Sequence, residues 1–124
     1  MDQRPEADRI LVAQLTGEAR HRARWRDLTS SEEAAAVAEL RTLAGGRADL
    51  LAEVPGILEG ASEGRHDEPF ARQAAGLCRK AGADPDAIAA WTEEGRRRAR
   101  ERQDAAAVRL ARPVSAINEA MTPA

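Results

Sequence analysis

Apolar residues recur at helical spacing through most of the chain, and the clearest stretch covers residues 67–102. Its first apolar stripe, with members spaced i, i+4, i+7, i+8 and i+11, consists of Phe70, Ala74, Leu77, Cys78 and Ala81. A second stripe begins with Ile88 and Trp91. Between them lie Gly82, which suits the left-handed position after a helix, Asp84, which can cap, and Pro85, which suits a first turn. The pattern predicts a helix, a tight corner and a second helix, with Leu77, Cys78, Ile88 and Trp91 buried.

The earlier part of the chain predicts three further helical segments. The first covers about 5–27, and the second covers about 31–44, where Ser30 and Glu33 fit a capping box. The third begins near residue 47 and carries the most hydrophobic stripe of the chain. Pro55 interrupts that stripe, and because proline removes a backbone donor and crowds the preceding turn, we expect a kink or two short helices there.

Past Trp91 the apolar pattern weakens. Gly95 costs about 1 kcal/mol relative to Ala inside a helix and predicts an end or a thinning of that helix. Residues 96–111 are strong helix formers, and Pro113 predicts their end. The fold prediction is therefore all-α: a small bundle of four main helices, with a kink at Pro55 and an extended basic C-terminal helical arm. We expect a single helical domain over 1–112, with a core over about 5–95, a basic arm over 96–112 and a disordered tail over 113–124.

Composition indicates a thin core. The 124 residues include 28 Ala but only 20 Leu, Ile, Val and Phe together, so a partner or self-association could add stability. The single cysteine, Cys78, excludes an internal disulfide and a multi-cysteine metal site. No apolar run approaches the roughly 20 residues that span a bilayer, and the N-terminus has no signal-peptide pattern, so we expect a cytoplasmic protein without membrane contact.

Charge is divided along the chain: residues 31–70 carry a net charge of −6, and residues 96–112 carry +5. One interpretation of the two arginine runs is surface ion pairs, because Glu18 and Arg22, Glu93 and Arg97, and Glu94 and Arg98 are i, i+4 pairs. The other is a contact surface for a nucleic acid or an acidic partner, in which Trp25 could stack on an unpaired base. Its candidate contact residues are Arg20, Arg22, Arg24, Trp25, Arg26, Arg96, Arg97, Arg98, Arg100 and Arg102.

The stretch 70–94 resembles a helix-turn-helix motif, whose buried positions and corner glycine match Leu77, Cys78, Gly82, Ile88 and Trp91. The motif's outward positions fall on Asp84, Asp86, Ala89, Ala90 and Glu93, where acids repel phosphates and alanines offer no hydrogen bonds to bases. As a whole, the chain resembles the short Ala- and Arg-rich helical proteins of GC-rich bacteria, a likeness of composition that carries no functional residues.

Catalytic signals are absent from the sequence. His21 and His66 are the only histidines, and there is no glycine-rich phosphate loop and no metal-binding or nucleophile motif. We therefore expect no enzyme activity, no cofactor and no metal. The leading hypothesis is a non-catalytic helical interaction or regulatory module that acts through protein–protein contacts or self-association. The alternative is a helix-turn-helix-like, nucleic-acid-binding regulator that uses the arginine clusters.

Overall fold

The structure is a computed structural model that describes residues 4–23, 27–61 and 68–121, with side chains described for 4–23, 27–61 and 70–109. All regular elements in these ranges are α-helices, which confirms the all-α prediction. In chain order they are α1 (Glu6–Arg22), α2 (Ser30–Ala44), α3 (Ala48–Leu51), α4 (Val54–Gly60), α5 (Glu68–Lys80) and α6 (Pro85–Met121).

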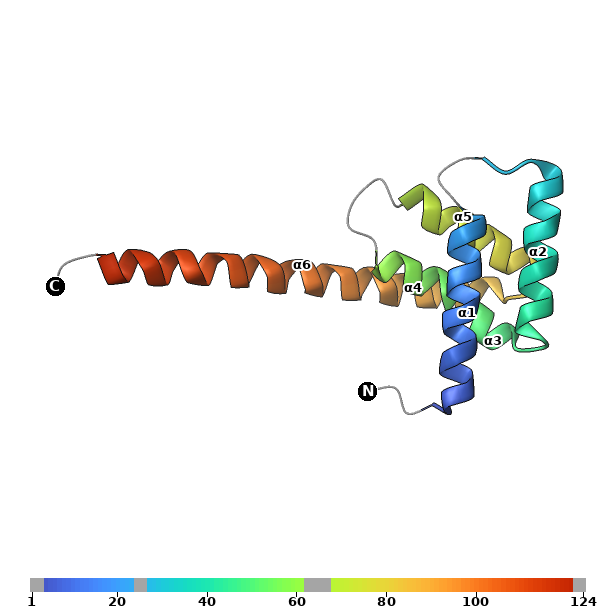
Figure 1. Cartoon of the computed structure of the whole chain (residues 1–124), viewed down its shortest axis with the longest axis horizontal. Helices are drawn as coiled ribbons and strands as arrows, with labels where there is room; N and C mark the ends of the chain where they lie inside the picture. Colours follow the sequence, from blue (N-terminus) through green and yellow to red (C-terminus); the bar gives the residue numbers. More distant parts are fainter. Residues whose placement is uncertain (1–3, 24–26, 62–67, 122–124) are drawn as a thin grey trace.

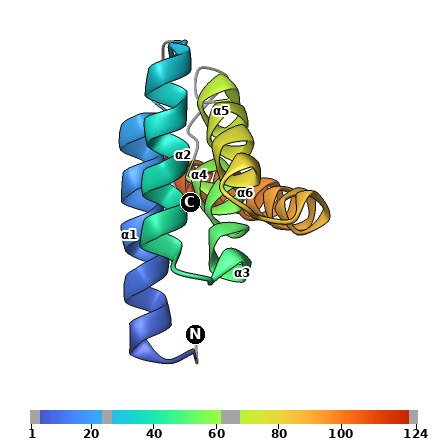
Figure 2. The same ribbon diagram turned by 90° about the vertical axis from the view of Figure 1, so that its right-hand side faces the viewer.

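The helices form a small bundle from which one long helix projects. The first two, α1 and α2, lie side by side and antiparallel, and α4 and α5 pack against them (Figures 1 and 2). On the other side, α4 packs along the first turns of α6. The 37 residues of α6 correspond to about 55 Å of helix, and most of that length extends beyond the bundle (Figure 1).

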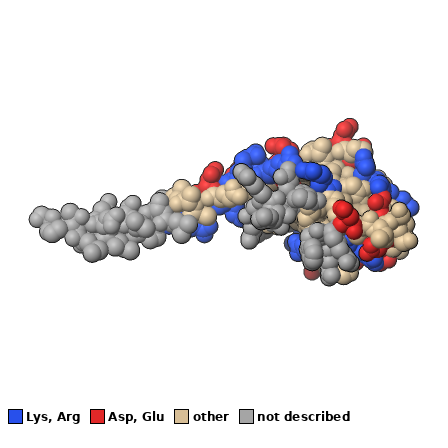
Figure 3. All heavy atoms as spheres, turned by 90° about the horizontal axis from the view of Figure 1, so that it is seen from above, with Lys and Arg blue, Asp and Glu red and all other residues tan. Residues whose placement is uncertain are grey.

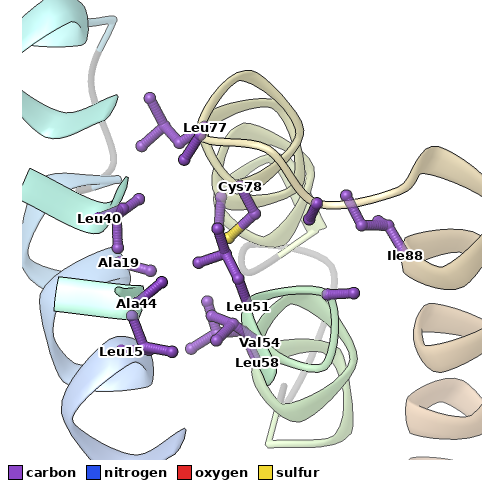
Figure 4. Packing of buried hydrophobic residues seen from close by; sticks show 14 of the residues in the cluster. Leu15, Ala19, Leu40, Ala44, Leu51, Val54, Leu58, Leu77, Cys78 and Ile88 are labelled. Carbon is purple, nitrogen blue, oxygen red and sulfur yellow. The ribbon is translucent and has the colours of Figure 1, made fainter. Parts of the chain in front are cut away.

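The core joins all six helices through small and aliphatic side chains. Leu15 of α1, Leu40 of α2 and Leu51 of α3 are fully buried, as are Val54 of α4 and Cys78 of α5. Figure 4 shows these side chains converging between the helices, with Ile88 of α6 at one edge. Alanines fill the remaining positions, so the helices approach closely but bury little apolar area per residue.

The corner between α5 and α6 forms as the sequence predicts. Gly82 adopts a φ of +121°, a conformation that favours glycine. The amides of Gly82 and Ala83 donate to the carbonyls of Arg79 and Cys78, at 3.1 and 3.0 Å, which is a Schellman arrangement. The Asp84 carboxylate then accepts a 3.0 Å hydrogen bond from the amide of Ala87 and caps α6.

Three predicted boundaries move by a few residues. The first helix ends at Arg22 rather than near residue 27. The capping box of α2 uses Thr29 and Glu32 rather than Ser30 and Glu33. The sequence allows either pair, because two hydroxyl residues are followed by two acids at the required spacing. The observed pair places Leu28, which precedes Thr29, against the core. The expected two short helices, α3 and α4, are present, but the break precedes Pro55, which occupies the first turn of α4.

The helix does not end at Gly95, where the sequence predicted an end or a thinning, and the end predicted at Pro113 is wrong, because α6 continues through both residues to Met121. Gly95 lies where the backbone of α6 packs closely against that of α4. At Pro113 the helix loses one backbone hydrogen bond and continues.

The prediction that Trp91 is buried is also wrong, since 36% of this residue is exposed. The reason is a glycine crossing between α4 and α6. A Cβ atom built on Gly95 would lie 2.1 Å from the carbonyl oxygen of Gly56, and one on Gly56 would lie 2.2 Å from the carbonyl oxygen of Trp91. With the two backbones this close, no space remains between the helices for an indole ring, which therefore lies at the edge of the contact.

Candidate interaction surfaces

Five arginines of the first turns of α6 beyond Gly95 form the α6 arginine cluster, namely Arg96, Arg97, Arg98, Arg100 and Arg102. All five are exposed. Four of them form ion pairs with described acids. Arg96 reaches Glu59 of α4 at 3.2 Å, Arg98 reaches Glu94 at 3.2 Å, and Arg100 reaches Glu93 at 3.7 Å. Arg97 pairs with both Glu94 and Glu101.

These ion pairs agree with the interpretation of the arginine runs as residues that form surface ion pairs. The expected pairs Glu18–Arg22 and Glu94–Arg98 are present. Arg97 pairs with Glu94 and Glu101 rather than with Glu93. Hydrogen bonds from Arg97 lower the pKa of the Glu94 carboxyl to about 2. Glu94 is therefore ionised throughout the physiological range and offsets charge of the α6 arginine cluster. In Figure 3, red atoms lie beside blue atoms on the described part of α6.

The other predicted arginine run lies at the end of α1. Arg20 is exposed, and Arg22 is half-buried and bonded to Glu18 at 2.8 Å. Arg24, Trp25 and Arg26 lie outside the described residues.

Arg20 and Arg22 lie on α1, whereas the α6 arginine cluster lies on a different helix. The helix α4 packs against both α1 and α6. In Figure 1, α1 crosses the line of α6, and its last turn lies to one side of that line.

The outward positions of the helix-turn-helix resemblance are all exposed. They comprise Asp84, Asp86, Ala89, Ala90 and Glu93. The charge of the three acids repels a phosphate backbone. Trp91 is also exposed, but it is two residues from Glu93, so about 200° of helix rotation separate it from that acid.

Beyond the α6 arginine cluster, the helix has little cover. Of the described side chains in 101–109, all except Ala106 are exposed, and Val108 is 52% exposed. We call residues 99–109 the projecting arm. It carries Ala99 and Ala106, which are seven residues apart and therefore form an apolar stripe along one side of a helix that extends away from the bundle (Figure 1).

A groove of about 470 Å³, which the sequence pattern did not predict, lies along α1, and we call it the α1 groove. Five small or apolar residues line it, namely Val12, Ala13, Thr16, Gly17 and Ile57, together with Arg4, Arg9 and Arg20. The Thr16 hydroxyl donates to the carbonyl of Val12 at 2.7 Å, so its proton is not offered to the groove. The only sequence signal was the small pair Ala13 and Gly17 one turn apart on a helix surface, because Ile57 comes from a different element.

Charges around the α1 groove are unevenly paired. Arg4 is held by the buried Glu53 at 2.6 Å, and Arg47 anchors the start of α1 through a bidentate pair with Asp8, at 2.8 and 3.1 Å. Hydrogen bonds from Arg47 lower the pKa of Asp8. By contrast, no described carboxylate forms an ion pair with Arg9 or Arg20.

Other reactive groups lie away from these surfaces. Burial raises the pKa of the Cys78 thiol to about 12. Within the described residues, His, Cys, Asp and Glu side chains form no group of three or more that could hold a metal ion. His66 lies outside those residues. Over the same ranges, none of the helices combines the length and apolar character needed to cross a membrane.

Comparison of this chain with protein-family models, with curated proteins and with solved structures finds no match.

Proposed function

We propose that this protein is a non-catalytic interaction module that docks on another macromolecule, or on a second copy of itself, through the projecting arm of α6. The observation that carries the proposal is that the described side chains of 101–109, apart from the half-buried Ala106, are exposed on a helix that leaves the bundle. Helical segments gain most of their stability in proteins from packing of one face. A regular helix with no packing partner among the described residues is therefore suited to contact with another macromolecule.

The thin core supports the same proposal. Alanines provide much of the buried surface, and each contributes little apolar area. Any partner that binds only the folded chain would add to its stability by mass action.

The alternative, a helix-turn-helix-like regulator that binds nucleic acid through the arginine clusters, has less support. Four members of the α6 arginine cluster already pair with Glu59, Glu93, Glu94 or Glu101. Phosphates would have to displace these carboxylates or leave them nearby, where they repel the nucleic acid. The outward face of α6 is acidic as well.

Site-specific cross-linking tests the proposal. Ala106→Cys places a thiol on the apolar stripe of the projecting arm, and Asp104→Cys places one on the opposite side of the same helix, because two residues correspond to about 200° of rotation. Cys78 is buried, so a maleimide benzophenone attaches to the introduced thiol. Irradiation is carried out first with the pure protein and then in a native extract.

We expect Ala106→Cys to give one discrete cross-linked species, with itself or with a partner, and Asp104→Cys to give much less of it. Sedimentation velocity of the unlabelled chain distinguishes self-association from a foreign partner. The proposal fails if the protein sediments as a monomer and both variants cross-link equally weakly. The alternative is tested by fluorescence anisotropy with labelled DNA and RNA at about 50 mM salt, where phosphate contacts are strong. It would be favoured if the protein binds nucleic acid and this binding is abolished by Arg96→Ala, Arg97→Ala and Arg98→Ala.

A further inference from the structure

We infer that the α1 groove is a second docking site, which binds an acidic amphipathic helix of another protein. This inference concerns a surface distinct from the projecting arm and does not depend on the function proposed for the arm. It rests on the shape of the groove and on the two arginines, Arg9 and Arg20, that have no described ion-pair partner.

The shape of the α1 groove suits a helix. Its lining extends over three turns of α1, from Arg9 to Arg20, and Ile57 of α4 contributes from a second element. Ala13 and Gly17 keep the α1 backbone accessible, and a Cβ atom built on Gly17 meets no atom within 4 Å. A partner helix laid along α1 could therefore place a large apolar side chain over Gly17 and pack against Val12 and Ile57, as in other complexes in which a groove binds a helix.

The charges of the α1 groove select an acidic occupant. Arg9 and Arg20 are eleven residues apart, so they lie within about 20° of each other around the helix and about 16 Å apart along it. Most other described arginines are paired within the chain, whereas these two line the groove and have no described ion-pair partner. Acidic side chains about three turns apart on a docked helix would meet both of them.

A second copy of this chain is a poorer occupant. The segment 96–112, which includes the projecting arm, carries a net charge of +5 and would meet Arg9 and Arg20 with like charge. The acidic outward positions of α6 have the complementary sign, but a contact between two different surfaces of identical chains tends to propagate into rings or filaments. A foreign acidic helix avoids both difficulties.

The test uses a fluorescein-labelled synthetic peptide of about four helical turns, with leucines on one face and glutamates flanking them, and a second peptide with lysines in place of the glutamates. Anisotropy titrations with the full-length protein measure Kd. Gly17→Phe fills the α1 groove, and Gly76→Phe is the matched control, because a Cβ atom at Gly76 also meets no atom within 4 Å but lies on α5. Arg9→Glu with Arg20→Glu reverses the groove charge, and Arg79→Glu controls for the loss of an exposed arginine on α5.

We expect Gly17→Phe and the double charge reversal each to weaken binding of the acidic peptide by about tenfold or more, which corresponds to about 1.4 kcal/mol. The Gly76→Phe and Arg79→Glu controls should retain the native Kd. The lysine peptide should bind the double charge reversal better than it binds the native protein.

The inference is overturned if the acidic peptide binds Gly17→Phe and the double charge reversal as tightly as it binds the native chain, which would locate binding elsewhere. It is also overturned if the native chain forms a dimer in sedimentation velocity that Gly17→Phe dissociates without peptide, since the occupant would then be a second copy. Neither result bears on cross-linking through Ala106→Cys, so failure of this inference and failure of the proposed function are distinguishable.

Discussion

Replacing Gly95 with alanine tests the glycine crossing between α4 and α6. Helix propensity alone predicts that Gly95→Ala stabilises the protein by about 1 kcal/mol, because alanine is the better helix former. The packing predicts the opposite. The new Cβ atom would lie 2.1 Å from the oxygen of Gly56, 3.0 Å from its carbonyl carbon and 3.0 Å from the amide nitrogen of Gly60. All three are backbone atoms, so no flexible side chain can move aside.

The size of the effect follows from the required displacement. Non-bonded carbon and oxygen atoms rarely approach closer than about 3.3 Å, so the two helices must separate by about 1 Å. A gap of this size forfeits a quarter to a half of the dispersion energy of the contacts across it. Overpacking typically costs about 1–3 kcal/mol and occasionally more. Because all three clashing atoms belong to the backbone, we take the upper end of this range, about 3 kcal/mol. After the gain of about 1 kcal/mol in propensity is subtracted, we expect Gly95→Ala to lower the free energy of unfolding by about 2 kcal/mol, which is a fall in Tm of about 8 °C for a chain of this size.

The assay is urea and thermal unfolding followed by far-UV circular dichroism. Gly17→Ala is the matched control: it is the same substitution at another glycine inside a helix, where the Cβ atom meets nothing within 4 Å. We expect this control to raise the free energy of unfolding by up to about 1 kcal/mol. If Gly95→Ala were as stabilising as Gly17→Ala, the close crossing of α4 and α6 would be refuted.

Three further predictions concern single groups. The thiol of Cys78 should react with Ellman's reagent at pH 8 only as fast as the protein unfolds, because burial raises its pKa to about 12; rapid reaction of the native chain would contradict its burial. Thr29→Ala should lower the free energy of unfolding by about 1 kcal/mol, and Ser30→Ala should leave it nearly unchanged, as urea unfolding can show; equal effects would disprove the capping register. Because Arg97 lowers the pKa of Glu94 from 4.5 to about 2, their bond contributes fully above pH 4.5 and is lost as the pH falls towards 2. Between pH 4.5 and pH 2, the free energy of unfolding should fall less steeply with pH in Arg97→Gln than in the native chain. Identical slopes for the two proteins would argue against the bond.

The sequence determined those features that depend on a few adjacent residues. The corner at Gly82 is one, because a helix stop, a left-handed glycine, a capping carboxylate and a first-turn proline act within one short segment. The burial of Leu77 and Cys78 is another, since helical periodicity sets which face turns inward. The capping box of α2 was predicted in kind, but its register depended on how Leu28 meets the core.

Tertiary structure decided how closely the helices approach and which charges meet. Periodicity places Trp91 and Gly95 near the same face of α6, but only the proximity of the Gly56 backbone makes Gly95 indispensable and displaces the indole of Trp91 to the surface. The partner of Arg96 is Glu59, 37 residues earlier in the chain, which no local pattern indicates. The α1 groove likewise exists only because α4 brings Ile57 beside α1. Local sequence sets the conformation of each helix, whereas distances between helices depend on packing of the whole chain, and the candidate binding surfaces arise from those distances.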